Sequence, residues 1–237
     1  MIGIDFTIDV QKLLSQPRAD LFYERLSEYK KKDSVDVRTI DDDGDEDYAC
    51  ALVKKYAHWT SVLLGLCQEN VSGKRIVEVG PGYAGRFMMD YLTEQGADVS
   101  GIDVALYPDH TGPSQGRYKA VPWESISEGF SPGSVDIIHV SNMYPDPSPL
   151  QVRKDLTGRN LIKRWKAHRY LVGYESLVLQ QTNNVLKEGG CLVLWHRICS
   201  DFSFNPEIVK KAGYDHRSIN SWTSHSVGHT LDLYRKK

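Results

Sequence analysis

Residues 75–85 read RIVEVGPGYAG, and this stretch decides the fold of the chain. Its first half is a short apolar run, which is typical of a strand buried on both faces of a parallel sheet. The run enters a GxGxxG pattern formed by Gly80, Gly82 and Gly85. Glycine is favoured where a strand turns sharply into a helix and where the backbone approaches a ligand closely. We therefore predict a strand, a tight bend and a helix whose free amide groups face an anionic ligand group, the alternative being a purely structural bend.

Strand-like and helical stretches alternate downstream of this bend. Such alternation is typical of a parallel sheet whose strands are joined by crossover helices. The predicted strands are residues 75–80, 98–104, 117–121, 135–141 and 191–196, and the predicted helices are 86–95 and 159–187, the second ending at Gly189-Gly190.

The last part of the chain has a different pattern. A short helix at residues 206–212 precedes two strand-like runs at 216–222 and 229–234, which predict an antiparallel hairpin. We therefore expect an α/β fold of three layers, with a Rossmann-like, seven-stranded and mostly parallel sheet that ends in an antiparallel hairpin.

The first 70 or so residues differ from the rest, because they contain helical patterns and no strand-like alternation. Helices are expected at about residues 15–29 and 46–69, on either side of the acidic run DDDGDED at 41–47. We interpret that run as a solvated stretch of charge. The predicted division is an N-terminal helical cap at 1–72, placed over the ligand, and a ligand-binding domain at 73–237.

The composition restricts the class of protein. The sequence has 237 residues, with 29 Lys plus Arg against 31 Asp plus Glu, a formal net charge of −2, which argues against a dedicated duplex-DNA binder. It contains no run of 18 apolar residues and no basic flank or cleavage site near residue 1, so we expect neither a membrane span nor a signal peptide. The four cysteines form no CxxC pair, which favours a cytoplasmic protein with reduced thiols and no metal site. The sequence leaves the oligomeric state open.

Two acidic residues indicate which ligand the bend would bind. Asp103 ends the second predicted strand, 23 positions after Gly80, where a carboxylate accepts hydrogen bonds from both ribose hydroxyls and repels a 2′-phosphate. NAD and S-adenosylmethionine remain. Glu78 lies two positions before Gly80, and a carboxylate there suits a methionine amine better than a pyrophosphate. The sequence also lacks the YxxxK pair of short-chain dehydrogenases, so S-adenosylmethionine is favoured.

VEVGPGYAG at residues 77–85 and GIDV at 101–104, followed by GSVDII, LKEGGCLVLW and HTLDLYRKK, resemble the motifs of class I S-adenosylmethionine-dependent methyltransferases. The resemblance covers about residues 73–237. It implies a Rossmann-like methyltransferase with S-adenosyl-L-methionine as its cofactor. It implies a cofactor site formed by Glu78, Gly80, Pro81, Gly82, Gly85, Asp103, Val104, Trp123, Glu124, Ser141 and Asn142, with Trp123 and Glu124 beside the adenine.

The acceptor is expected past the carboxyl ends of the fourth and fifth strands. The stretch SNMYPDPSP follows the fourth strand. In it, Asn142 offers hydrogen bonds to a substrate amide, Tyr144 can stack or donate, and Asp146 can act as a base or orient the acceptor. His196 ends the fifth strand and is a candidate general base, because imidazole titrates near neutral pH. The alternatives are a rigid proline turn and a structural histidine.

These observations favour an enzyme that methylates a small molecule or a peptide. RNA methylation is an alternative, because PDPSP resembles the PDPWP of tRNA (guanine-N7) methyltransferases and a basic stretch follows at residues 153–169. A second alternative is a catalytically silent module that binds S-adenosylmethionine, and a third is an NAD-linked oxidoreductase.

Overall fold

The fold is given by a computed structural model, which describes residues 4–9, 12–13, 18–32, 46–103, 112–141, 161–197, 204–222 and 228–237. Its strands form one seven-stranded sheet in the order β3-β2-β1-β4-β5-β7-β6. β7 runs antiparallel to both of its neighbours, and all other adjacent pairs are parallel. The predicted sheet with its closing hairpin is confirmed. The strands are β1 Arg75–Val79, β2 Asp98–Ile102, β3 Tyr118–Lys119, β4 Val135–Ser141, β5 Leu186–Arg197, β6 Tyr214–Trp222 and β7 Gly228–Lys236.

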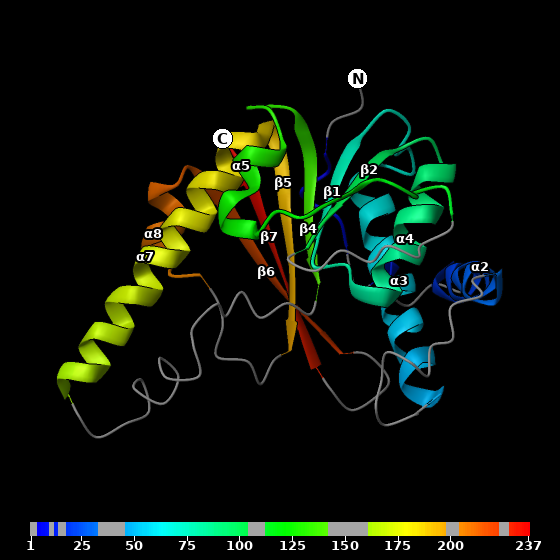
Figure 1. Cartoon of the computed structure of the whole chain (residues 1–237), viewed down its shortest axis with the longest axis horizontal. Coiled ribbons are helices and arrows are strands. Elements are labelled where there is room, and N and C mark those ends of the chain that lie inside the picture. Colours follow the sequence, from blue (N-terminus) through cyan, green and yellow to red (C-terminus); the bar gives the residue numbers. More distant parts are fainter. Residues whose placement is uncertain are drawn as a thin grey trace.

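Helices cover both faces of this sheet (Figure 1). α3 and α4 lie on one face, and α2 packs across these two helices. α5, α7 and α8 lie on the other face. The layers are therefore helix, sheet and helix, as predicted. The helices are α2 Arg18–Lys32, α3 Glu46–Leu66, α4 Gly82–Glu94, α5 Ile126–Gly129, α7 Leu161–Val185 and α8 Pro206–Lys211, with a 3₁₀ turn at Trp123–Ser125.

Each face of the sheet has its own hydrophobic core, because successive residues of a strand point to opposite faces. In β1, Ile76 packs toward α3 and α4, whereas Val77 and Val79 pack toward α5 and α7. In β7, Leu231 and Leu233 face the α3 side and Tyr234 faces the α8 side. The strands are apolar on both faces, and this is the origin of the continuous apolar runs in the sequence.

The helices predicted within residues 1–72 share the core of one sheet face. Trp59, Leu63 and Leu66 of α3 are buried in the same cluster as sheet residues such as Ile137 and Val193. Phe22 of α2 belongs to the same cluster, and its ring packs edge-on against the ring of Tyr91 with the centroids 5.4 Å apart. α3 thus packs on the sheet as one of its flanking helices, and the expectation that this segment also covers the acceptor stays a prediction.

The boundary between α7 and β5 differs from the prediction. The sequence places the helix end at Lys187 and the strand start at Cys191, whereas α7 ends at Val185 and β5 begins at Leu186. Leu186 pairs with Val135, after which the register shifts so that Cys191 pairs with Ile137. A Cβ at Gly190 would lie 2.8 Å from the Lys187 carbonyl oxygen. Gly190 therefore allows close packing in this irregular part of the strand, whereas Gly189 has open space around it and adopts a left-handed backbone with a φ angle of 72°. The two glycines lie within β5 and do not mark a helix end.

Two other elements begin at least two residues earlier than predicted, both for local reasons. α4 begins at Gly82, inside the glycine bend, and not at Arg86 as predicted, because Pro81 already has helical backbone angles. β6 begins at Tyr214, since this residue already pairs with Lys236 of β7. None of the helices in the described ranges is both long enough and apolar enough to cross a membrane.

Candidate functional site

The glycine bend joins β1 to α4 at the point where the strand order of the sheet reverses, between β1 and β4. The Gly80 backbone amide donates a 2.8 Å hydrogen bond to the carbonyl of Ile102, which ties the bend to the end of β2. Gly80 and Gly82 have φ angles of 62° and 51°. Side chains disfavour this left-handed conformation, which explains the glycines. A Cβ at Gly82 would meet nothing within 4 Å, so the space beside the bend is open at this position.

The third glycine of the motif has a packing role. A Cβ at Gly85 would lie 2.7 Å from Pro81 Cβ and 2.9 Å from the Tyr56 hydroxyl. That hydroxyl donates a 3.0 Å hydrogen bond to the Pro81 carbonyl. Gly85 therefore lets α3 approach the bend closely. This contact between α3 and the bend had no signal in the sequence beyond a tyrosine at helical spacing.

Asp103 lies beside the bend, as its spacing predicts. It follows the last residue of β2 and is half-buried, and its backbone amide donates a 3.2 Å hydrogen bond to the Lys119 carbonyl of β3. Because Gly80 is bonded to Ile102, the residue before Asp103, the structure brings the acid and the bend together at adjacent strand ends. Val104 lies outside the described residues.

Trp123 and Glu124, predicted neighbours of an adenine, lie in the 3₁₀ turn at Trp123–Ser125. The Trp123 indole is buried, donates a 3.0 Å hydrogen bond to Thr182 of α7 and meets the Phe204 ring at 6.2 Å. It is therefore a core residue of the α7 side. Glu124 is half-buried and accepts a 3.4 Å hydrogen bond from Tyr174. The placement of Glu124 leaves part of its side chain exposed, and its contact with adenine stays a prediction.

Glu78 contacts a residue that the sequence reasoning did not single out. Its side chain is fully buried, and its Oε2 atom contacts Nδ1 of His139 on β4, which is also fully buried. The two residues are direct partners in the β1–β4 register. The signal was present, because each is a charged or titratable residue inside an otherwise apolar strand run, RIVEVG and VDIIHVS.

The remaining predicted residues are described only in part or not at all. Ser141 ends β4 opposite Trp195, and His196 pairs with Thr230 of β7, but only their backbones are described. Both strands end at the expected edge. Asn142, Tyr144 and Asp146 lie outside the described residues. Within the described ranges, His, Cys, Asp and Glu side chains form no group of three that could hold a metal ion.

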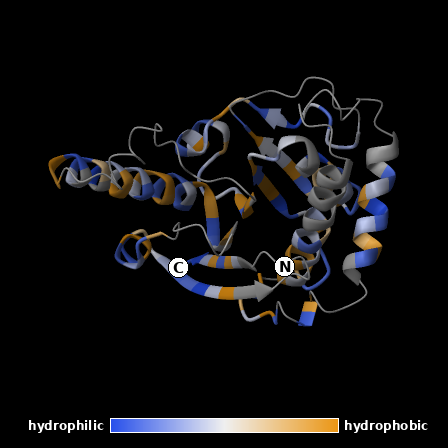
Figure 2. Cartoon of the chain, turned by 90° about the horizontal axis from the view of Figure 1, so that it is seen from below, coloured by the Kyte–Doolittle hydropathy of each residue, from blue (hydrophilic) through white to orange (hydrophobic). Residues whose placement is uncertain are grey.

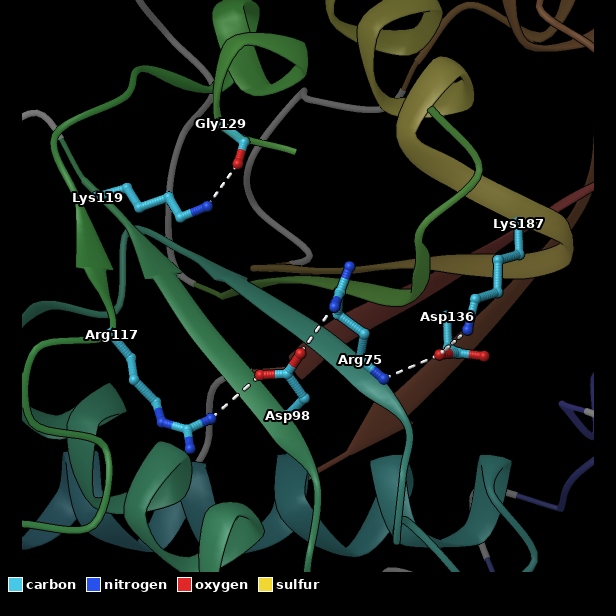
Figure 3. Close-up of polar contacts among 7 residues, drawn as sticks. All are labelled: Arg75, Asp98, Arg117, Lys119, Gly129, Asp136 and Lys187. Atoms are coloured by element: carbon cyan, nitrogen blue, oxygen red, sulfur yellow. Dashed lines mark hydrogen bonds and ion pairs between the residues drawn. The ribbon is translucent and has the colours of Figure 1, made fainter. Parts of the chain in front are cut away.

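Charged residues at the amino ends of the strands, opposite the glycine bend, pair with one another (Figure 3). Asp136 accepts hydrogen bonds from the Arg75 amide at 2.8 Å and from Lys187 Nζ at 2.6 Å. Asp98 accepts from Arg75 Nε at 2.8 Å and from Arg117 at 3.1 Å. These contacts hold the starts of β1, β2 and β4 together. The charged residues at this end of the sheet therefore stabilise the fold.

Buried thiols and phenols on the α3 and α4 side of the sheet are poor candidates for nucleophiles or bases. Burial raises the pKa of Cys67 to about 11 and that of Cys191 to about 12. Burial also raises the pKa of Tyr118 far above its usual value. These groups stay protonated at neutral pH, and their side chains act as packing residues.

The comparisons with known proteins concern the fold. No family model and no curated protein matches the sequence. A 1,6-didemethyltoxoflavin-N1-methyltransferase from Burkholderia thailandensis, solved with S-adenosylhomocysteine, is similar at a TM-score of 0.50 and 14% identity over 99% of this chain and 94% of that chain.

Two further solved structures are similar over most of their length. A TehB-like SAM-dependent methyltransferase from Corynebacterium glutamicum has a TM-score of 0.47 and 17% identity, over 70% of this chain and 82% of that chain. A SAM-dependent methyltransferase from Archaeoglobus fulgidus has a TM-score of 0.47 and 9% identity, over 76% and 94%. Together with the strand order, the likeness to the Burkholderia enzyme shows that this chain has the seven-stranded Rossmann-like fold found in S-adenosylmethionine-dependent methyltransferases.

Proposed function

We propose that the chain is an S-adenosylmethionine-dependent methyltransferase that acts on a small-molecule or peptide acceptor. One observation carries the proposal: a glycine bend with left-handed backbone at Gly80 and Gly82 opens α4, and Asp103 lies at the adjacent strand end. Rossmann-like sheets bind nucleotide ligands with these two features at neighbouring positions. The open space beside Gly82 is where a bulky ligand group would fit.

The bend and the strand ends would divide the binding of the cofactor. The first backbone amides of a helix have no partner within the helix, so those at the start of α4 suit the carboxylate of a methionine part. Asp103 would accept hydrogen bonds from the ribose hydroxyls, as charge-assisted bonds of this type favour. S-adenosylmethionine, when bound, supplies a methyl group on a sulfonium that is already activated for displacement.

The residues at the ends of β4 and β5 would then hold the acceptor in line, which is mainly an effect of proximity. Ser141 and His196 end or nearly end these two strands. For a hydroxyl or ammonium acceptor, His196 would take the proton, and Asn142, Tyr144 and Asp146 would orient the acceptor.

Calorimetric titration tests this proposal directly. We expect S-adenosylmethionine to bind the wild-type protein and NAD not to bind. Asp103→Ala should weaken the binding of S-adenosylmethionine by roughly 1.5–3 kcal/mol, as for the loss of a hydrogen bond to a charged group. Asp98→Ala is the matched control, because Asp98 starts the same strand and is bonded to Arg75 and Arg117 at the opposite edge. Equal affinity in Asp103→Ala and wild type would remove Asp103 from the site.

One observation favours RNA as a second candidate acceptor. The first half of α7 reaches away from the sheet and mixes apolar with hydrophilic residues (Figure 2). Lys163, Lys166 and Arg169 are exposed there, and the Arg169 guanidinium lies 4.8 Å above the ring of exposed Trp165. Cations beside an exposed aromatic ring suit a nucleic-acid strand. Transfer of a labelled methyl group to cellular RNA, lost in a Lys163→Glu, Lys166→Glu double variant, would favour this candidate over a small acceptor.

A further inference from the structure

A fully buried contact between two polar side chains lies next to the glycine bend in the sequence. Glu78 of β1 and His139 of β4 face each other across two neighbouring strands, and both side chains have no exposed surface. Burying a carboxylate is unfavourable unless a partner compensates for the lost hydration. The pair lies between β1 and β4, where open α/β sheets bind their ligands, and Glu78 is two residues from Gly80.

The imidazole of His139 makes its hydrogen bond to Glu78 alone. Nδ1 contacts the Glu78 carboxylate, whereas Nε2 is buried without a hydrogen-bond partner. A buried polar atom without a partner is uncommon and calls for an explanation. Here the ring is oriented by one carboxylate and by packing, since Trp59 meets it at 5.7 Å between centroids. Its hydrogen-bonding capacity is therefore directed at Glu78.

α3 connects this pair to the bend. Tyr56 and Trp59 are three residues apart, so both lie on the same side of the helix, and their rings meet edge-on at 4.5 Å. Tyr56 is hydrogen-bonded to the Pro81 carbonyl of the bend, and Trp59 packs on His139. Contacts therefore run without interruption from the bend through Tyr56 and Trp59 of α3 to His139, and from His139 to Glu78.

We propose that His139 is a positioning residue of the cofactor site, which holds the Glu78 carboxylate in place for the amine of the methionine part. This inference rests on the proposed function. His139 itself would touch no part of the cofactor. It would act only through Glu78, so its effect should be confined to ligands that carry the amino-acid group.

Two ligands and two variants separate this role from a merely structural one. S-adenosylhomocysteine carries the amino-acid group, and 5′-methylthioadenosine has the same adenosine without it. We expect His139→Leu to weaken S-adenosylhomocysteine about tenfold or more, as for loss of one charge-assisted hydrogen bond, and to leave 5′-methylthioadenosine within about twofold, a difference too small to reflect a lost hydrogen bond. His139→Asn should restore most of the lost affinity, because the Asn amide nitrogen can take the place of Nδ1.

Equal weakening of both ligands, or no weakening of either, would overturn the role of His139. Failure of wild-type protein to bind either ligand would instead overturn the proposed function. Should His139→Leu not fold, ¹⁵N NMR of wild-type protein decides the matter. The His139 Nδ1 signal should shift on addition of S-adenosylhomocysteine and not on addition of 5′-methylthioadenosine, and identical responses to the two ligands would contradict the proposal.

Discussion

The hydroxyl of Tyr56 donates a 3.0 Å hydrogen bond to the carbonyl of Pro81 and so fastens α3 to the glycine bend. This hydrogen bond therefore links α3 directly to the candidate site. We therefore expect the conformation of the bend to depend in part on this hydrogen bond.

Removing the hydroxyl should loosen the bend. Tyr56→Phe leaves the ring in place and loses one buried hydrogen bond, which should lower the free energy of unfolding by about 1 kcal/mol and weaken S-adenosylmethionine binding. Urea denaturation and calorimetric titration measure the two effects. Tyr170→Phe, a change on the exposed part of α7, serves as the control. Unchanged binding in Tyr56→Phe would show that the bend holds its shape without this hydrogen bond.

Glycine substitutions should differ according to what surrounds each glycine. Gly85→Ala would force a methyl group to within 2.7 Å of Pro81 Cβ, and such overpacking should destabilise the protein by about 1–3 kcal/mol. Gly173→Ala is the matched control. Gly173 lies within α7, and a Cβ there would meet nothing within 4 Å. This control should stabilise the helix by up to about 1 kcal/mol. Thermal unfolding of both variants gives the comparison, and an equally stable Gly85→Ala protein would refute the close approach of α3.

Stability should fall at alkaline pH because of the buried thiols. Burial raises the pKa of Cys67 from 9.0 to about 11 in the folded chain. Above pH 9 the unfolded chain therefore binds fewer protons than the folded chain. The contribution is fully present below pH 9 and is lost as the pH rises through about 11, at up to about 1.4 kcal/mol per pH unit for one thiol.

Cys67→Ala provides the test of this pH dependence. Cys67 and Cys191 are the two thiols with raised pKa values in the part of the chain that the structure describes, and the variant lacks one of them. Its stability should therefore decline less steeply between pH 9 and 11 than that of wild type. Urea denaturation at a series of pH values measures the slopes. Parallel curves for the two proteins would show that Cys67 titrates alike in both states.

The charged cluster at the other edge of the sheet should affect stability without affecting binding. Asp136→Ala removes the acceptor for Lys187 and for the Arg75 amide. It also removes a carboxylate that lies 3.9 Å from Nζ of Lys74, whose side chain is only 10% exposed. We expect a loss of about 3 kcal/mol, as for breaking a buried ion pair. Asp98→Ala should cost under about 1 kcal/mol, because its pairs are exposed. Weakened cofactor binding in a folded Asp136→Ala protein would contradict the separation of the two edges.

The sequence predicts the sheet well because its information is local. Apolar runs such as RIVEV and VDIIHVS are buried on both faces, and the glycines mark the bend before α4. The helix-to-strand boundary at Leu186 could not be predicted. Gly189 and Gly190 resemble a helix end in the sequence, but they lie within β5, where the register between β4 and β5 shifts.

The candidate site shows the same division. The proximity of Asp103 to the bend follows from strand order and was predicted. The pairing of Glu78 with His139 depends on the register between β1 and β4, which join distant parts of the chain. The hydrogen bond from Tyr56 to Pro81 depends on how α3 lies against the sheet. No local sequence pattern predicts either contact, because both form only in the packed tertiary structure.

The position of β7 has a consequence for how the protein is made. β7 follows all other strands in chain order, yet it lies between β5 and β6. During synthesis, β5 therefore presents an unpaired and largely apolar edge until β7 emerges from the ribosome. Exposed edges of this kind invite pairing between separate chains. Chains that stall or are cleaved before Gly228 should aggregate, and chaperone demand should be greatest in that interval.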